Sequence, residues 1–199
     1  MTSSSPDLNL LAEQIQSDDP SRAMPALAGL RDLSEQQATP LLLLGLKHDV
    51  FMVRSIACSG LGMKRSEAGW QALEQILTQE TDPNVRAEAA NSIASYGVAR
   101  AWPLLQQRFS SDHHWLVRCS ILSALAEQPE MEASWLEDLA HMACRDQDGT
   151  VRVGGVEILA RLVREGRGSS RPSVREELAA LQKDPDHRVV AAALNGLQG

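Results

Sequence analysis

The sequence predicts an all-α protein, a right-handed α-solenoid of about six helix pairs. The first observation is a Val-Arg pair that recurs, with its arginines at positions 54, 86, 118 and 152, so that they are 32, 32 and 34 residues apart. The second is composition: aromatic residues make up only 4% of the chain, whereas alanine and leucine are abundant. Small residues and leucines favour closely packed helices over a sheet, and a period of this length is typical of repeat arrays.

The repeated segment is clearest between Asp82 and Gly97. Its Asp-Pro start combines an N-cap residue with a proline that suits the first helical position. Apolar residues at i, i+4 and i+8 form one stripe, and Gly97 is placed to end the helix in a left-handed turn. Related segments run over residues 49–62, 112–126, 146–162 and 184–197, the last with Val190 in place of the arginine.

The N-terminal part is predicted to be a degenerate first repeat over residues 7–32, after a frayed start over residues 2–6. Asp7 is placed to cap one helix, and an Asp-Asp-Pro sequence ending at Pro20 is placed to open the next. Pro25 fits that second helix only if it lies in the first turn.

The core repeats are predicted to cover residues 38–164. Thr39-Pro40 is interpreted as the cap and first turn of a helix that contains four consecutive leucines, residues 41–44, and that lies inside the stack. The helix from Asp49 is expected to end at Gly62. Further first helices are expected from Ser66, Ala99 and Met131.

The C-terminal part consists of a Gly/Ser-rich loop over residues 165–171 and a terminal repeat over residues 172–199. The loop is the longest turn-rich stretch of the chain. Val190 at the arginine position fits an atypical terminal repeat. The whole chain, residues 1–199, is predicted to form a single repeat domain.

Charge and cysteine content restrict the classes of function. The formal net charge is −7, which argues against a general nucleic-acid-binding surface, because such a surface needs clustered lysine and arginine. The three cysteines form no CxxC pair and no even framework, which favours a reducing compartment. No signal peptide or membrane span is expected, so the predicted location is cytoplasmic.

Two motifs of the chain resemble the HEAT repeat. The second helices carry Asp-Pro-x-Val-Arg-x-x-Ala-x-x-x-Leu-Gly, and a first helix carries Ala-x-Pro-Leu-Leu. The short period and the segments 52–62 and 101–105 resemble the HEAT-like repeats of cyanobacterial phycobilin lyases of the E/F type and of related phycobilisome-degradation proteins. The resemblance covers nearly the whole chain and is strongest over residues 49–162.

This resemblance implies a protein-binding module that acts on an α or β subunit of a phycobiliprotein. Such proteins attach linear tetrapyrroles to cysteines, remove them, or act as chaperones for the subunits. It therefore implies a lyase-type activity or an accessory role in one, a phycobilin bound transiently rather than permanently, and a second HEAT-repeat protein as partner. The alternative is a generic scaffold or assembly factor without bilin chemistry.

The recurring arginines have two interpretations. In a stacked array they fall on equivalent positions, where an aspartate of a neighbouring unit can accept a charge-assisted hydrogen bond. They can instead form an anion-binding row for propionates or acidic partners. The structural ladder is assigned to Asp49, Arg54, Asp82, Asp112 and Asp146, and the candidates for binding are Arg86, Arg118 and Arg152.

A cluster of His113, His114 and Trp115 departs from the repeat pattern and is expected in a loop just before a second helix. Loops carry function more often than framework positions do. An aromatic ring beside two imidazoles can stack on a planar tetrapyrrole or anchor a partner, whereas the other interpretation is a partly packed loop tryptophan. Tyr96 is a further candidate for partner or bilin binding.

No metal site is predicted and no catalytic residue is assigned. Adjacent histidines diverge, and His141 with Cys144 supplies only two ligands, which is too few for a zinc site. No histidine is followed by glutamate, so the chain lacks the His-Glu pairs on which di-iron hydroxylases of this architecture depend. Cys58 and Cys119 are expected to pack as small apolar residues, with a transient thioether to bilin as the alternative.

Overall fold

The protein is described by a computed structural model over residues 6–167 and 172–198. These residues form twelve α-helices and one 3-10 helix, without a strand among them. The predicted all-α repeat architecture is confirmed. Two compact units, residues 1–101 and 102–199, make up the chain. Most of the predicted frayed start and residues 168–171 of the Gly/Ser-rich loop lie outside the described residues.

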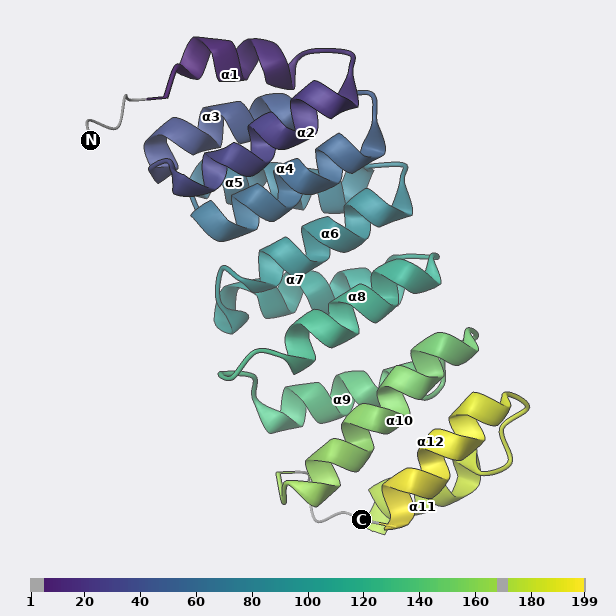
Figure 1. Cartoon of the computed structure of the whole chain (residues 1–199). Helices are drawn as coiled ribbons and strands as arrows, with labels where there is room; N and C mark the ends of the chain where they lie inside the picture. Colours follow the sequence, from purple (N-terminus) through teal and green to yellow (C-terminus); the bar gives the residue numbers. More distant parts are fainter. Residues whose placement is uncertain (1–5, 168–171, 199) are drawn as a thin grey trace. The chain divides into compact units, whose positions relative to one another are not determined.

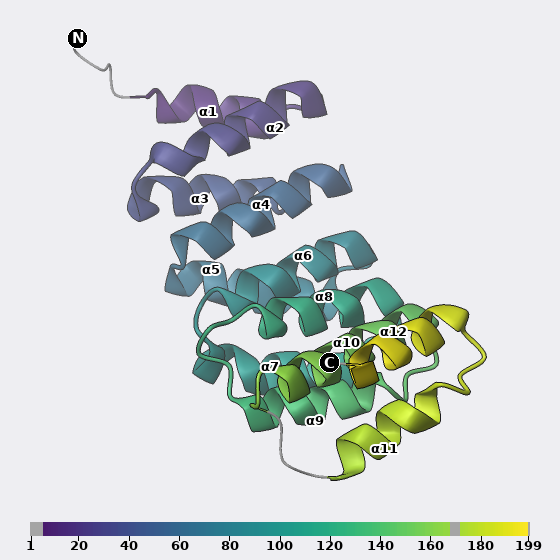
Figure 2. The ribbon, with the colours of Figure 1, turned by 60° about the horizontal axis from the view of Figure 1, so that its bottom comes forward.

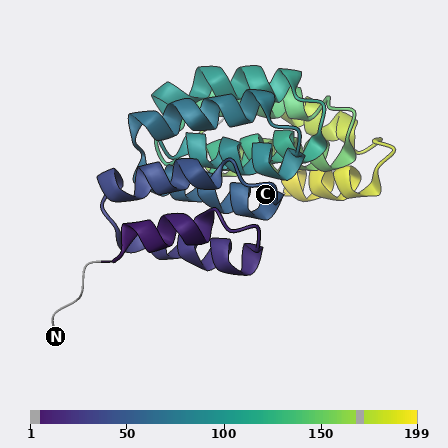
Figure 3. The same ribbon diagram turned by 90° about the horizontal axis from the view of Figure 1, so that it is seen from above.

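The first unit consists of helix pairs arranged in two layers. The second helices α2, α4 and α6 pack side by side in one layer, in front of α3 and α5 in Figure 1. Seen from above, α1 lies beside α2 (Figure 3). The bounds are α1 Leu8–Ile15, α2 Pro20–Gly29, η1 Leu30–Asp32, α3 Glu35–Gly45, α4 Phe51–Lys64, α5 Glu67–Gln79, α6 Pro83–Ala94 and α7 Val98–Ser111, whose first residues belong to this unit.

The second unit repeats the same arrangement. Helix α10 packs against α8, α9 and α12, so that α8, α10 and α12 form the layer of second helices. Figure 2 shows α11 alongside α12, which it contacts. The bounds are α8 Trp115–Ala126, α9 Ala133–Ala143, α10 Gly149–Arg164, α11 Pro172–Leu181 and α12 His187–Gln198.

Every second helix from α4 onward buries one stripe at a fixed distance from the arginine position. One buried residue lies directly before the arginine position, which is Val190 in α12, and another lies three residues after it. In α4, α6, α8 and α10 a third buried residue lies seven residues after it. Burial of one such valine, leucine or isoleucine stabilises the fold by roughly 1.5–3 kcal/mol. The stripe comprises Val53, Ala57, Leu61, Val85, Ala89, Ile93, Val117, Ile121, Leu125, Val151, Gly155, Leu159, Val189 and Ala193.

Helix α3 begins one turn earlier than predicted. Ser34 and Gln37 form a capping box, in which the Ser34 hydroxyl accepts from the Gln37 N–H and the Gln37 side chain accepts from the Ser34 N–H. The prediction that Thr39-Pro40 caps the helix was wrong because this box satisfies the N-terminal donors first. Thr39 is buried instead, and its hydroxyl donates to Ser66 Oγ at 3.1 Å.

Helix α4 continues through Gly62, where it was predicted to end. A Cβ on Gly62 would lie 2.9 Å from Ser92 Cα, so the missing side chain allows α6 to approach α4 closely. Because the helices are this close, the Ser95 hydroxyl donates a hydrogen bond to the Gly62 carbonyl at 2.7 Å. The helix ends at Lys64, and its C-cap residue Arg65 adopts the left-handed conformation with φ 54°.

Two other details differ from expectation and one agrees with it. Pro25 lies in the second turn of α2 rather than the first, and the helix continues through it. Only half of the leucine run is buried: residues 41 and 42 are buried, and residues 43 and 44 are half-buried. Gly97 has φ +103° just after α6, as the predicted turn requires.

Candidate interaction surface

A polar side chain lies two residues before the N-cap of each second helix from α4 onward. It accepts a hydrogen bond from the N–H of that N-cap residue at 2.8–2.9 Å. This bond closes a tight turn between the two helices of a pair. The residue, called the loop acceptor below, is His48, Glu80, Asp112, Asp146 or Asp184.

The recurring arginine binds the loop of its own helix pair. In each of the four repeats, Nη1 donates to the backbone carbonyl of the loop acceptor at 2.8–3.0 Å. Six residues separate this donor and acceptor, so the guanidinium folds back over the start of its helix. The residues concerned are Arg54, Arg86, Arg118 and Arg152.

The recurring arginine also binds the loop acceptor of the following repeat through Nε and Nη2, as in Arg54, Arg118 and Arg152. Arg118 holds Asp146 at 2.7 and 2.8 Å, and both side chains are nearly buried. A guanidinium is suited to this because its planar fork matches a carboxylate. The equivalent pairs are Arg54 with Glu80 at 2.8 and 3.1 Å and Arg152 with Asp184 at 2.9 and 2.8 Å.

The ladder acids are partly different from those assigned from the sequence. Glu80 and Asp184 occupy the loop-acceptor position, which their register two residues before the N-cap could have revealed. Asp82 caps α6 by accepting from the Asn84 N–H at 2.8 Å. Asp49 supplies its carbonyl to Arg54 Nη1 at 2.8 Å.

The ion pairs of the ladder shift the pKa values of the side chains that form them. The hydrogen bonds from Arg152 hold the pKa of Asp184 below its usual value, and Asp184 raises the pKa of Arg152 in turn. Burial raises the pKa of Glu80, but the bonds from Arg54 and from backbone N–H groups outweigh it, so that the pKa is lowered. Both carboxylates are therefore held in the charged form by the guanidinium of the preceding repeat.

His113, His114 and Trp115 lie together at the start of α8. His114 is the N-cap, with Nδ1 accepting from the Leu116 N–H at 3.3 Å. Trp115 is the first residue of α8 rather than a loop residue, and it is 42% exposed. The rings of His114 and Trp115 are stacked with centroids 5.9 Å apart, and His113 is exposed. A partly exposed indole beside the imidazole of His114 is thus accessible here.

Tyr96 packs within the first unit. Its hydroxyl donates to the Leu61 carbonyl at 2.9 Å, and its ring meets Trp70 edge-on with centroids 5.5 Å apart. Burial raises the pKa of Tyr96 to about 12. The Arg100 guanidinium lies 4.0 Å from the Trp70 ring centroid. In the second unit, the rings of Trp102 and Trp135 stack with centroids 5.2 Å apart.

The cysteines are poorly suited to nucleophilic chemistry. Burial raises the pKa of Cys58 and Cys144 to about 12 and that of Cys119 to about 11. Thiolate, the reactive form, is therefore scarce near neutral pH. Among the described residues, no group of three or more metal-ligating side chains is placed to hold an ion. None of the described helices combines the length and apolar character that crossing a membrane requires.

The outer surface of the second-helix layer is built from four positions per helix. They lie two residues before the arginine position and two, five and nine residues after it, and are called face positions below. In the first unit they are exposed or half-buried throughout. Helix α4 supplies Met52, Ile56, Ser59 and Met63, and α6 supplies Asn84, Glu88, Asn91 and Ser95.

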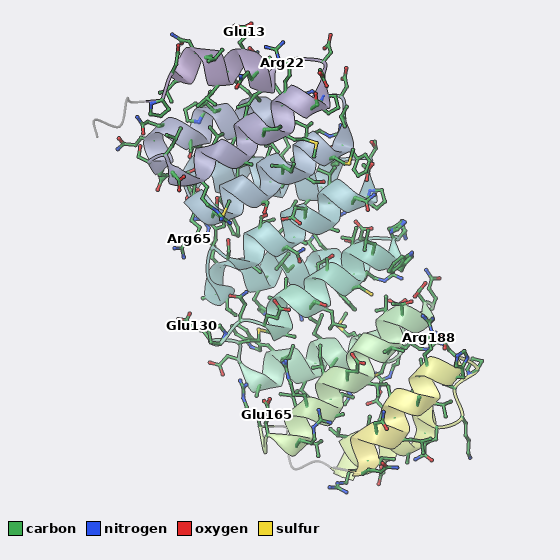
Figure 4. All side chains as sticks on the ribbon, in the orientation of Figure 1. Glu13, Arg22, Arg65, Glu130, Glu165 and Arg188 are labelled. Atoms are coloured by element: carbon green, nitrogen blue, oxygen red, sulfur yellow. The ribbon has the colours of Figure 1, made fainter. Side chains whose placement is uncertain are left out.

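Two grooves follow these face positions. The α4–α6 groove of the first unit has a volume of about 400 Å³ and is lined by Ser59, Met63, Glu88, Asn91 and Ser95. Arg65, labelled in Figure 4 at the end of α4, also lines it. The α8–α10–α12 groove of the second unit has a volume of about 490 Å³, and its lining includes Glu127, Glu157, Arg161 and Arg164.

Exposed large apolar side chains are concentrated on second helices. Among the described residues, Leu10 and Met142 are the examples on first helices. Neighbouring exposed apolar groups, such as the two methionines at face positions of α4, mark interaction sites more often than isolated ones do. The examples on second helices are Phe51, Met52, Met63, Trp115 and Leu194.

The repeats themselves identify the family of the chain. The sequence profile of HEAT repeats matches residues 39–126 and, in an overlapping alignment, residues 70–160. The chain belongs to the HEAT-repeat family. In HEAT terms, the arginine ladder joins successive repeats, and the face positions form the outer surface of their second helices. A comparison with curated protein sequences finds no match.

Solved structures that share the HEAT fold with this chain include the following three. YibA from Escherichia coli has 16% identity and a TM-score of 0.68 over 96% of this chain and 70% of its own. Human deoxyhypusine hydroxylase has 15% identity and a TM-score of 0.50, with 96% of both chains covered. The CpcE–CpcF complex of a Nostoc phycocyanin lyase has 18% identity and a TM-score of 0.58, covering 98% of this chain and 77% of that one.

Proposed function

We propose that this HEAT-repeat chain is a protein-binding module whose second-helix surface holds a phycobiliprotein α or β subunit. The observation that carries the proposal is the concentration of exposed apolar side chains on second helices. The fold shared with CpcE–CpcF of phycocyanin lyase supports this choice of client. The module acts in the cytoplasm in bilin attachment, detachment or chaperoning, with a second HEAT-repeat protein as a further partner.

In this proposal the chain contributes positioning, and the client contributes the reactive thiol. The raised pKa values of its own cysteines disfavour a thioether carried on this chain. In the proposal a phycobilin binds transiently. The exposed ring of Trp115 beside His114 is the surface on which a planar tetrapyrrole would stack.

Co-purification with separate phycobiliprotein subunits, with and without bilin, tests the proposal. We expect the tagged chain to retain at least one subunit. The double variant Met52→Ser, Met63→Ser should lose it, whereas Met142→Ser, which alters an exposed methionine on α9, should retain it. An absorption scan of the same fractions reports whether bilin is held. Retention of no subunit would remove the phycobiliprotein as client.

The second candidate is a scaffold or assembly factor without bilin chemistry. The fold shared with YibA and with deoxyhypusine hydroxylase favours this candidate, because one architecture can carry unrelated functions. Stable association with another complex, with bilin spectra unchanged on mixing, would support this candidate over the first.

A further inference from the structure

The α4–α6 groove contains a carboxylate that differs from the ladder acids. Glu88 is half-buried and lines the groove beside Ser59 and Asn91. Burial raises its pKa above the usual value. Ladder acids such as Asp146 are bound by a guanidinium, whereas no ion pair joins Glu88 to a lysine or arginine of the described residues. A partly desolvated carboxylate without a cation is a recognition element for one.

Methionine and isoleucine side chains occupy face positions of α4, and Met63 lines the groove together with Glu88. Ile56 holds the same register in α4 as Glu88 does in α6, and the two helices pack against each other. Met52 is 45% exposed and Met63 is 51% exposed. Methionine side chains are flexible and polarizable, so they adapt to the shape of an apolar partner.

The spacing of these positions matches the surface of a helix. Met52, Ile56 and Met63 follow i, i+4 and i+11 along α4, which is a stripe roughly 16 Å long. An amphipathic partner helix of about three turns presents apolar residues with the same spacing. Arg65 also lines the groove and places a positive charge there.

We propose that the α4–α6 groove binds an amphipathic α-helix of the partner protein, with a lysine or arginine on that helix paired to Glu88. Its apolar stripe packs on Met52, Ile56 and Met63. The inference rests on the proposed protein-binding function and adds the chemistry of the bound segment. A neutral residue opposite Glu88 would leave the partly desolvated carboxylate without a cation, so the groove selects basic helices.

Synthetic helices provide the probe. Three alanine-rich peptides of about 18 residues carry leucines at i, i+4, i+7 and i+11 and differ at one position beside the stripe, which is lysine, glutamine or glutamate. Each is titrated into the full chain labelled at its methionine methyl groups. We expect the signals of Met52 and Met63 to shift, and those of Met142 and the buried Met131 to stay. The lysine peptide should bind about tenfold tighter than the glutamine peptide.

Variants of the chain separate the charge from the apolar contact. Glu88→Gln should abolish the preference for lysine, and Glu88→Lys should transfer it to the glutamate peptide. Glu74→Gln, at an exposed glutamate on α5, is the matched control and should keep the preference for lysine. Circular dichroism of each variant verifies that the helices are formed.

Three results would overturn the inference: no binding of any peptide, equal affinity for all three, or shifts at Met142 instead of Met63. These outcomes are distinct from failure of the proposed function. If the native chain and Glu88→Gln retain a phycobiliprotein subunit equally, the proposed function is supported and this groove is not the binding site. If the peptides behave as expected but no subunit is retained, the groove is supported as a helix-binding site and the partner is another protein.

Discussion

Arginine links one loop of the array to the next because its guanidinium can bond a carbonyl and a carboxylate at the same time. Arg118 is the most buried example, with 5% of its surface exposed. Its donors are directed at Asp112 and Asp146, which leaves it in an architectural position. A lysine at this position would supply the charge but not the planar fork.

Replacing Arg118 with alanine should lower the free energy of unfolding by about 3 kcal/mol, because Asp146 would remain nearly buried without its partner. Urea unfolding measures the change. Arg100→Ala is the control: it breaks an exposed pair with Glu67 and should cost much less. Unchanged stability together with lost client binding would instead assign Arg118 to the anion-binding row.

Acid should weaken the array through the ladder carboxylates. The pKa of Asp184 is held below its usual 3.8 by Arg152, and that of Glu80 is lowered below 4.5. A group whose pKa is lower in the folded state stabilises it above the unfolded-state pKa, and this contribution is lost as the pH falls through the folded-state pKa. Urea midpoints should therefore decline below roughly pH 4.5.

The variant Asp184→Asn should flatten that decline, because it removes one of the titrating groups. Glu74→Gln, at an exposed carboxylate, is the comparison. An acid dependence that stays equally steep in Asp184→Asn would show that other carboxylates dominate it.

Cys119 should react slowly with iodoacetamide in the folded chain. Burial, with the nearby Asp148 and Asp146 as further causes, raises the pKa of its thiol to about 11. At pH 8 only about one thiol in a thousand would be ionised, compared with roughly a quarter at an unperturbed pKa near 8.5. Mass spectrometry of alkylated peptides, with the urea-unfolded chain as reference, measures the difference. Fast alkylation near neutral pH would restore the thioether-carrier interpretation.

At the scale of elements, the distance between helices depends on small residues at the buried stripe. Gly155 of α10 occupies the position that is alanine in α4 and α6. A Cβ there would lie 2.8 Å from the Ala140 carbonyl oxygen and from the Cys144 nitrogen of α9. Both neighbours are backbone atoms, so the contact cannot be relieved by a rotamer change.

Gly155→Ala should therefore destabilise the protein by about 1–3 kcal/mol, as overpacked cores do. Gly29→Ala is its counterpart, since Gly29 has φ −65° and a Cβ there would meet no atom within 4 Å. That variant should gain about 0.4–1 kcal/mol by restricting the unfolded chain. Thermal unfolding of both variants measures these changes, and equal effects would refute the packing argument.

At the scale of the whole molecule, the acidic excess sets which partners are attracted. A net charge of −7 opposes the counterion release that drives nucleic-acid binding. We expect the chain to pass through an immobilised-DNA column even at low salt. Retention that is lost as salt is raised would show a basic surface that the overall charge conceals.

Much of the fold could be predicted from the period because every copy repeats the same buried stripe. Helix ends were less predictable, since neighbouring signals compete: the capping box at Ser34 starts α3 ahead of Thr39-Pro40. Gly62 has the composition of a helix end but serves the contact with Ser92. The candidate binding residues could be named from the sequence, but not their availability. In the fold, the Tyr96 hydroxyl bonds the Leu61 carbonyl, and the Arg118 guanidinium bonds the Asp146 carboxylate of the next repeat.

The sequence by itself determined the all-α repeat architecture, because a stripe of apolar residues at a fixed period can be buried only by stacking equivalent helices. Only the tertiary structure decided which polar residues are used in that stacking and which remain available. Arg118 and Glu88 are both charged residues of second helices, in α8 and α6. The fold brings a carboxylate of the next repeat to Arg118 and surrounds Glu88 with serine, asparagine and methionine, so Arg118 joins repeats and Glu88 remains available to a partner.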